Sequence, residues 1–321
     1  MKNILITGSG GYIGKLLLEK CHKELGKTFR KIIALDLNAP ETALEGIDYV
    51  QIDIRKHDEV AALLPKYEID TVIHLAAIIA ISGQVSRNME YEVDVIGTSK
   101  LIDACVECGV KRFITTSSGA AYGYWPSNTD KVLTEDMPMK GNYEIPYSYH
   151  KWLVEEKLKQ VRQDSPQLEQ LIFRVGTILG ATTSNPITDY LKRDKILCLS
   201  GYESAFVAIW DMDLVEILFK AINGGNPGIY NVAGNGSVPT KAIAKMMDKP
   251  TQTLPVSLLK LAFSILRPLR LVPYGPESLK FIQYRPVLGN EKLKAEFGYT
   301  PQKSSKEVIE YWIENNYKKS K

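Results

Sequence analysis

The chain has 321 residues, 45% of them hydrophobic and 24% charged, with a formal net charge of +3. This is enough chain for a large core in one or two globular domains, and so small a net charge gives no reason to expect a nucleic-acid partner. The N-terminal apolar run is too short for a signal peptide, so we expect a cytoplasmic protein.

A glycine-rich loop follows the first predicted strand, residues 2–7. Gly8, Gly11 and Gly14 are spaced as Gly-x-x-Gly-x-x-Gly, and a predicted helix begins directly after them. Glycine at these positions permits a tight turn and lets the backbone approach a pyrophosphate, which the helix N-terminus attracts. The order of strand, loop and helix therefore predicts a dinucleotide site, with an ordinary glycine loop as the alternative.

An aspartate ends the second predicted strand, residues 31–36. At that place the carboxylate of Asp36 can accept hydrogen bonds from the adenosine ribose, and it would repel the 2′-phosphate of NADP. No arginine follows within residues 37–40 to bind such a phosphate. We therefore predict that the cofactor is NAD, with a turn-capping aspartate as the alternative.

Strands and helices alternate along the rest of the N-terminal half. Residues 48–54, 70–77 and 112–118 have the apolar pattern of buried strands, whereas residues 57–65 and 90–109 have helical spacing. This alternation predicts an α/β fold with a parallel, doubly wound sheet.

Ligands of such sheets bind at the carboxyl ends of the strands. Asp36, Asp53, Ala76 and Ser118 all fall at those predicted ends, so we expect them to lie near one ligand site. His74 lies inside an apolar strand, and we expect a packed, hydrogen-bonded histidine rather than a catalytic one.

Cys105 and Cys108 form one Cys-x-x-Cys inside a predicted helix. A zinc site would need two more ligands nearby, and none is in sequence reach. We therefore expect free thiols and no metal site.

The strongest candidate for chemistry is the pair Tyr147 and Lys151. They are four residues apart, which on a helix places both side chains on one face. Tyrosine is a poor base at neutral pH because its hydroxyl ionises only near pH ~10, but a neighbouring ammonium favours the phenolate. Such a pair can take a proton from a substrate hydroxyl. The spacing also occurs by chance on helix surfaces, so its weight comes from the motifs upstream.

Together these motifs resemble the extended branch of the short-chain dehydrogenase/reductase superfamily, which contains the NAD-dependent epimerases and dehydratases. The resemblance rests on Thr7–Gly14, Asp36, Asp53–Ile54, His74–Ala77, Thr115–Gly123 and Tyr147 with Lys151, and continues through residues 228–234, 285–293 and 297–301.

That resemblance covers nearly the whole chain and implies two domains. A Rossmann NAD-binding domain would occupy residues 1–175, and the chain would cross back to it near residues 205–235. A smaller, mixed domain that binds the substrate would occupy mainly residues 176–321.

The resemblance also implies catalytic roles. Tyr147 would be the acid/base. Lys151 would hold the nicotinamide ribose and would favour the phenolate form of Tyr147. Ser118 would be the catalytic hydroxyl, with Ser117 as the competing assignment. The family's usual asparagine before Gly-Thr is Asp94 here, which would alter hydrogen bonding near the catalytic strand.

Cofactor contacts follow from the same resemblance. Asp53 and Ile54 would flank the adenine. The residues expected to bind NAD are Gly8, Gly10, Gly11, Tyr12, Ile13, Gly14, Asp36, Asp53, Ile54, Leu75, Ala76, Ala77, Thr116, Tyr147 and Lys151.

Departures from the family pattern bear on the substrate. Gly119 and Ala120 stand where sugar dehydratases of this branch carry Asp-Glu, so we do not expect dehydration, and the pattern is closest to the 4-epimerases. Those enzymes bind a nucleotide diphosphate with an asparagine where this chain has Thr177, and with an arginine near residues 204–207, which hold no cation. The candidate substrate residues are Ser117, Thr177 and Arg285, with Lys192, Arg193 and Lys195 as further cations.

These features predict an NAD-dependent epimerase that acts on a sugar, and we expect a nucleotide sugar. Tyr147 would remove a hydroxyl proton during transient oxidation of the sugar, and the hydride would return on the other face. The alternatives are an NAD-dependent alcohol dehydrogenase or ketone reductase with an apolar or lipid-linked substrate and, less favoured, a non-catalytic NAD-binding regulator.

Related extended enzymes usually dimerise through two helices of each subunit. Here those helices would lie near residues 90–109 and 149–163. We therefore expect a homodimer, with an apolar face supplied by Trp152, Leu153, Leu158 and Val161.

The most apolar run lies at residues 253–273, where prolines limit a helix to roughly residues 256–267. That is far short of the ~20 residues that span a bilayer. We expect a buried or half-buried helix of the substrate domain. The alternative is a patch over residues 256–272 that rests on a membrane surface, with Leu258, Leu261, Ile265 and Leu269 on lipid and Lys260, Arg267 and Arg270 at the headgroups.

Overall fold

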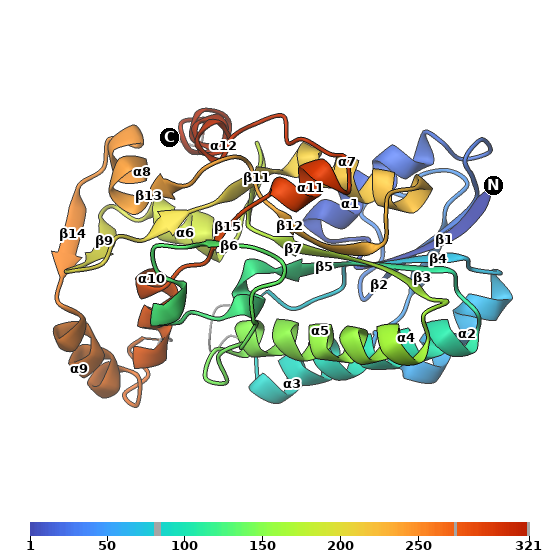
Figure 1. Cartoon of the computed structure of the whole chain (residues 1–321), viewed down its shortest axis with the longest axis horizontal. Coiled ribbons are helices and arrows are strands. Elements are labelled where there is room, and N and C mark those ends of the chain that lie inside the picture. The colour runs from blue at the N-terminus through green and yellow to red at the C-terminus, as the bar shows by residue number, and fades with distance from the viewer. Residues whose placement is uncertain (80–84, 273–274, 320–321) are drawn as a thin grey trace.

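The computed structural model describes residues 1–79, 85–272 and 275–319. Within them, seven strands form one parallel sheet in the order β12-β7-β5-β4-β1-β2-β3 (Figure 1). The direction of winding reverses between β1 and β4, which is where doubly wound sheets bind their ligands. The predicted fold class is confirmed. The strands are β1 (Lys2–Thr7), β2 (Phe29–Asp36), β3 (Asp48–Gln51), β4 (Thr71–His74), β5 (Arg112–Ser118), β7 (Glu169–Val175) and β12 (Gly228–Val232).

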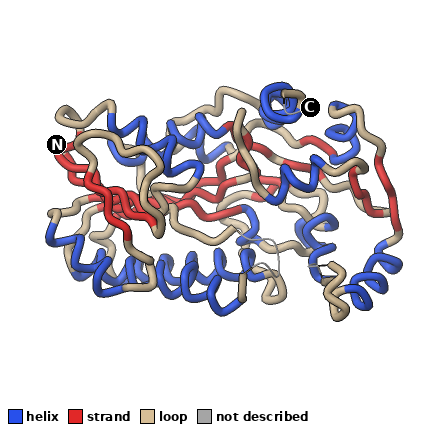
Figure 2. Tube along the Cα trace, turned by 180° about the vertical axis from the view of Figure 1, so that it is seen from behind, coloured by secondary structure: helices blue, strands red, loops and turns tan. Residues whose placement is uncertain are grey.

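Helices cover both faces of this sheet (Figures 1 and 2). Side chains alternate along β1, so that Ile4 and Ile6 join the apolar cluster of one face and Leu5 joins that of the other. The first face is covered by α1 (Tyr12–His22) and α7 (Asp211–Asn223), and the second by α2 (His57–Lys66), α4 (Thr98–Glu107) and α5 (Pro146–Asp164).

The single helix expected at residues 90–109 consists of three pieces. α3 (Arg87–Tyr91) leads into a π-helical segment, η1 (Glu92–Gly97), before α4 begins. Such wide turns occur mostly at functional sites. This one carries Asp94, whose Oδ1 accepts a hydrogen bond from the backbone of Ile78 at 2.8 Å and so ties the segment after β4 to the helix layer.

Short paired strands and helices form the remaining part of the molecule, at the end of the sheet nearest β12 (Figure 1). Its core contains the buried Trp312 and Val308. The strand pairs are β8 (Thr177–Leu179) with β11 (Ala208–Trp210), β9 (Ile196–Leu199) with β14 (Thr251–Leu254), β10 (Ala205–Phe206) with β13 (Val238–Pro239), and β6 (Val132–Leu133) with β15 (Val287–Leu288). The helices are α6 (Pro186–Lys192), α8 (Thr240–Met246), α9 (Val256–Leu266), α10 (Lys280–Gln283), α11 (Glu291–Ala295) and α12 (Ser305–Trp312). Short turns are η2 (Gly119–Tyr122), η3 (Pro126–Asn128), η4 (Pro276–Leu279) and η5 (Ile313–Tyr317).

The apolar helix α9 forms within the predicted residues 256–267, but several of its apolar side chains are exposed. Within α9 only Leu259 is buried, whereas Leu258, Leu261 and Ile265 are 53%, 61% and 54% exposed. A helix at the surface can pack only one stripe inward, and here a second apolar stripe faces out. The expectation of a buried helix is therefore wrong for these side chains. Among the described residues, no helix is long and apolar enough to cross a membrane.

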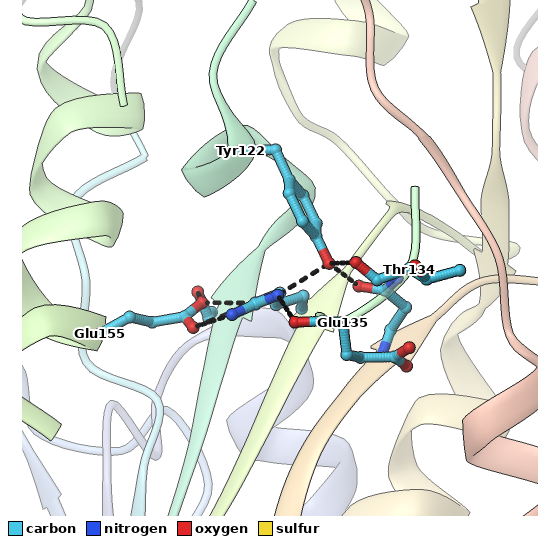
Figure 3. A network of polar contacts seen from close by, with 7 residues as sticks. Tyr122, Thr134, Glu135 and Glu155 are labelled. Atoms are coloured by element: carbon cyan, nitrogen blue, oxygen red, sulfur yellow. Dashed lines mark hydrogen bonds and ion pairs between the residues drawn. The ribbon is translucent and has the colours of Figure 1, made fainter. Parts of the chain in front are cut away.

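A buried ion pair links α5 to the sheet. Arg174 on β7 and Glu155 on α5 are 2% and 1% exposed, and their closest contact is 2.7 Å. Arg174 Nη1 also donates to the hydroxyl of Tyr122 at 2.7 Å, and that hydroxyl donates in turn to Asn231 on β12 (Figure 3). Burial alone would lower the pKa of Arg174, but the pair with Glu155 outweighs it and raises the pKa. The network thus joins α5, β7, η2 and β12.

Replacing Arg174 with alanine should lower the free energy of unfolding by about 3–5 kcal/mol, because Glu155 would remain as a buried charge without its partner. The matched control is Lys157→Ala on the same helix, where the pair with Asp103 is 28% and 41% exposed and a change within about 1 kcal/mol is expected. Urea unfolding of both variants measures the difference. Equal losses would contradict the special weight given to the buried pair.

The homodimer stays a prediction. Leu158 and Val161 are buried within the chain, whereas Trp152 and Leu153 on α5 are only half-buried and remain open to a partner. Light scattering at micromolar concentration should give twice the chain mass of 36.0 kDa. Leu153→Lys should shift the protein toward monomer, because a charge would enter the expected contact, while Val132→Lys, at an exposed position on β6, should not. A monomeric wild type would rule the dimer out.

Candidate active site

The glycine loop lies against the end of β4. Gly8 has φ +68°, and a Cβ there would lie 2.6 Å from the backbone nitrogen of Ala76. A Cβ on Gly14 would lie 2.2 Å from the carbonyl oxygen of Gly8, so both positions require glycine. Gly11 caps α1 without a side-chain hydrogen bond, which leaves the first amides of the helix available to a phosphate.

Asp36, the last residue of β2, contacts the glycine loop. Its Oδ2 accepts a hydrogen bond from the backbone of Gly10 at 2.9 Å, and its Oδ1 accepts one from Asn38 at 3.0 Å. The carboxylate thus stands at the edge of the glycine loop, where the ribose of a dinucleotide bound to that loop would lie.

The next acidic residue along this edge is Asp53, after β3. Its carboxylate pairs with Arg55, with 3.0 Å between Nε and Oδ1, and these hydrogen bonds lower the pKa of Asp53. The neighbouring Ile54 is buried and lies against Gly97 of η1.

His74 is a structural residue, as the sequence predicted. Its Nδ1 and Nε2 lie 2.7 Å and 2.8 Å from the hydroxyls of Thr7 and Thr98. Burial lowers the pKa of His74 to about 3, so the ring is neutral. It holds β1, β4 and α4 together directly before Leu75, Ala76 and Ala77, which line the edge of the sheet.

Tyr147 and Lys151 lie on the first two turns of α5, and both are half-buried. Lys151 Nζ donates to the carbonyl of Thr116 on β5 at 2.9 Å, and it lies 5.8 Å from the centroid of the Tyr147 ring. The helix start is pinned by Ser148, whose Oγ donates to the carbonyl of Ala120 at 2.7 Å. The pair is therefore fixed to the strand and the turn that carry the catalytic hydroxyl candidate.

Ser118 and Ser117 point to opposite sides of β5 because side chains alternate along a strand. Ser118 is half-buried, and its Oγ accepts a hydrogen bond from the backbone of Ala120 at 3.1 Å. Ser117 is 6% exposed, and its hydroxyl donates to Glu155 in the buried network. These contacts favour Ser118 over Ser117 as the catalytic hydroxyl and as a substrate-binding residue.

Arg285 lies in a cage of aromatic rings. Its guanidinium carbon is 3.6 Å from the ring centroid of Phe206 and 3.9 Å from that of Phe281. Phe281 packs edge-on against Tyr124 with 5.4 Å between centroids. Within the described part of the chain no hydrogen bond or ion pair to Arg285 is present, and its Nε is buried without a partner. Burial lowers the pKa of Arg285 to about 10, so it is still a cation at neutral pH.

The other substrate candidates lie in different settings. Thr177 on β8 is half-buried, and its backbone donates to Val207 at 3.0 Å. Lys192, Arg193 and Lys195 are exposed around the turn between α6 and β9, in contrast to the enclosed Arg285.

Two buried acids next to the site were not predicted as site residues. Asp94 Oδ2 lies 3.6 Å from Nδ1 of His150, the residue before Lys151, and both side chains are buried. Asp211 at the start of α7 accepts a hydrogen bond from the hydroxyl of Tyr12, the first residue of α1 after the glycine loop. Both contacts join segments that are distant in sequence, so neither contact could be predicted from a local motif.

The doubly wound sheet and its glycine loop define a dinucleotide-binding protein. The particular family follows from the sequence, because the model of the NAD dependent epimerase/dehydratase family matches residues 4–233. The chain belongs to this family. The predicted family, the enzyme class and the cofactor NAD are thereby confirmed.

Several relatives are informative. An uncharacterized protein of Mycobacterium tuberculosis (strain ATCC 25618 / H37Rv) is 20% identical over 314 residues, which are 96% of this chain and 82% of the relative. The UDP-glucose 4-epimerase of Neisseria meningitidis serogroup A is 30% identical over 199 residues, which cover 58% of this chain and 56% of that enzyme. A crystal structure of UDP-glucose 4-epimerase with UDP-glucose from Thermotoga maritima superimposes with a TM-score of 0.75 at 19% identity and covers 99% of both chains. At this identity the superposition shows a shared fold.

Asp36 should make the protein select NAD over NADP, because its carboxylate would repel the 2′-phosphate. Calorimetry of protein freed of cofactor should show binding of NAD at least ~10-fold tighter than that of NADP. Asp36→Asn should narrow this ratio, whereas Asp58→Asn, at an exposed position in the first turn of α2, should leave it unchanged. Equal affinity of the wild type for both cofactors would place Asp36 away from the ribose.

Proposed function

We propose that the protein is an NAD-dependent epimerase that acts on a nucleotide sugar. One observation carries this proposal. Lys151, one helical turn after Tyr147, is anchored to the carbonyl of Thr116, two residues before Ser118. This contact fixes the proposed cation, one turn after the proposed acid/base, to the strand that carries the proposed catalytic hydroxyl.

These side chains suit the reversible oxidation of a sugar hydroxyl. Bound NAD would supply the hydride acceptor and, once reduced, the donor. Tyr147 would take the proton of the substrate hydroxyl during the oxidation and would return it during the reduction. Ser118 Oγ donates a hydrogen bond to the substrate oxygen and stabilises the charge that develops there. Protons and electrons balance within one turnover, so no net redox change results.

The surroundings of Ser118 favour epimerisation over dehydration. Elimination of water needs a further acid and base, but the following residues are Gly119 and Ala120, both buried in η2. A Cβ on Gly119 would lie 3.1 Å from Leu288, so there is no room for a carboxylate side chain at that position unless Leu288 shifts. The carboxylate of Glu135 accepts a hydrogen bond from the backbone nitrogen of Asn231 at 2.7 Å, so it is already engaged within the chain.

Arg285 supports a phosphorylated substrate. Arg285 is half-buried, with its Nε buried and without a partner, and a diphosphate entering the cage would supply the missing anion. Tyr124 packs against Phe281 of the cage and also lies within electrostatic range of Tyr147. The proposal therefore places the sugar of the substrate between Arg285 and Tyr147.

An alcohol dehydrogenase or ketone reductase with an apolar substrate is the second candidate. It is favoured by the rings of Phe206 and Phe281 and by Thr177, which stands where the 4-epimerases carry an asparagine. Such an enzyme would need no diphosphate, and Arg285 would bind another anionic or polar group.

A panel of nucleotide sugars, assayed together with the content of bound cofactor, separates these candidates. An epimerase carries NAD through purification and interconverts two sugars without change in NADH absorbance. A dehydrogenase reduces added NAD in the presence of an alcohol. Binding of free UDP by calorimetry tests the diphosphate cage independently of turnover. Inertness toward the whole panel together with no binding of UDP would refute the nucleotide-sugar proposal.

Tyr147→Phe should lower turnover by a factor of ~10² or more, because it removes the group that moves the proton while the cofactor contacts remain. NAD affinity should change little. Lys151→Ala should lower both turnover and NAD affinity. Tyr143→Phe is the matched control, since that side chain is 66% exposed and should tolerate the change. Near-normal turnover of Tyr147→Phe would overturn the assignment.

A further inference from the structure

An apolar surface extends from α9 into the turn after it. It consists of Leu258, Leu261, Ile265, Leu269 and Leu271, which are 53%, 61%, 54%, 62% and 68% exposed, and is called the α9 patch below. Of the twelve large hydrophobic side chains that the described residues leave exposed, five belong to this patch. Such clustering differs from the scattered exposure that is normal at protein surfaces.

The patch is not the side by which the helix packs on its own domain. That side consists of Val256, Leu259 and Phe263, which join a cluster with Leu199 and Leu279. Exposed and packed residues therefore form two separate stripes on α9. In both views the helix lies at the end of the molecule far from the N-terminus (Figures 1 and 2).

The charged residues of the segment that carries the α9 patch are all basic. Residues 253–272 contain Lys260, Arg267 and Arg270 and no acidic residue. Arg267 pairs with Glu277 of η4 at 2.6 Å. Lys260 and Arg270 have no ion-pair partner within the described residues. Exposed leucines bordered by free basic side chains match the headgroup region of an anionic membrane.

We propose that the α9 patch docks the protein onto the surface of anionic phospholipid. The helix has 11 residues, so it lies in the plane of the interface rather than across it. A second copy of the chain fits less well. In a two-fold contact the patch would meet itself, and Lys260 and Arg270 would face like charges.

Docking would bring the Arg285 cage toward the membrane. α9 packs against η4, which continues directly into α10, and α10 carries Phe281 of the Arg285 cage. The ion pair of Arg267 with Glu277 fixes the turn after α9 to the same segment. The link between membrane docking and the substrate rests on the proposed function. It favours a substrate whose sugar or alcohol group is held at a lipid surface.

Co-sedimentation with vesicles tests the docking without any assay of activity. Wild type should pellet with phosphatidylglycerol/phosphatidylcholine vesicles at low salt, much less with phosphatidylcholine alone, and less as salt increases. Leu258→Ser/Leu261→Ser should lower the partition coefficient at least ~10-fold. Lys260→Glu/Arg270→Glu should lower binding to the anionic vesicles but should not change the weak binding to phosphatidylcholine vesicles. Val132→Ser is the matched control, because it removes an apolar side chain that is 55% exposed elsewhere on the surface.

The substituted side chains are exposed, so unchanged melting temperatures will show that the variants fold. Wild type that stays in the supernatant at low salt would overturn the proposal. So would serine variants that bind vesicles as well as wild type does. A loss of self-association in the serine variants without lipid, seen by light scattering, would assign the patch to a second copy instead. A failure of the epimerase assay would leave these outcomes untouched.

Discussion

The arrangement of the candidate site depends on the buried ion pair between Arg174 and Glu155. Each charge would be costly alone in the interior, so the sheet and α5 can pack only where the two groups meet. Glu155 lies four residues after Lys151, which lies four after Tyr147, so the three side chains share one face of α5. The contact of Glu155 with β7 therefore fixes the axial position and the rotation of α5, and with them the positions of Tyr147 and Lys151. The hydroxyl of Ser117 completes the contact and leaves Ser118 on the opposite side of the strand.

The parts of this protein that the sequence predicted are those in which local pattern and function coincide. The β1 strand and the glycine loop follow from an apolar run and from spacing that only glycine satisfies at Gly8 and Gly14. The Tyr147 and Lys151 pair follows from helical periodicity. In each case the residues that determine the geometry lie within one or two elements, which is why a single sequence is sufficient.

What the sequence did not predict depends on contacts between distant segments. No local pattern around Glu155 on α5 indicates that it pairs with Arg174, which lies 19 residues later on β7. The π-helical turn that holds Asp94 reads as ordinary helix because it preserves the apolar spacing. The exposure of Leu258 and Leu261 was misjudged for a related reason. Apolar periodicity shows that a helix has an apolar stripe, but it does not show how many stripes find a partner within the chain.

The Arg285 cage and the α9 patch are joined by one segment of the chain, residues 276–283. Where the 4-epimerases place a cation near residues 204–207, this chain has Phe206, and that ring covers the guanidinium of Arg285. The guanidinium of Arg285 thus lies against two aromatic rings, so a ligand that reaches it would also contact apolar surface. The η4 and α10 segment that supplies the second ring also carries the contacts of α9. The proposed docking of the α9 patch and the proposed binding of a diphosphate at Arg285 would therefore act on one connected segment of the chain.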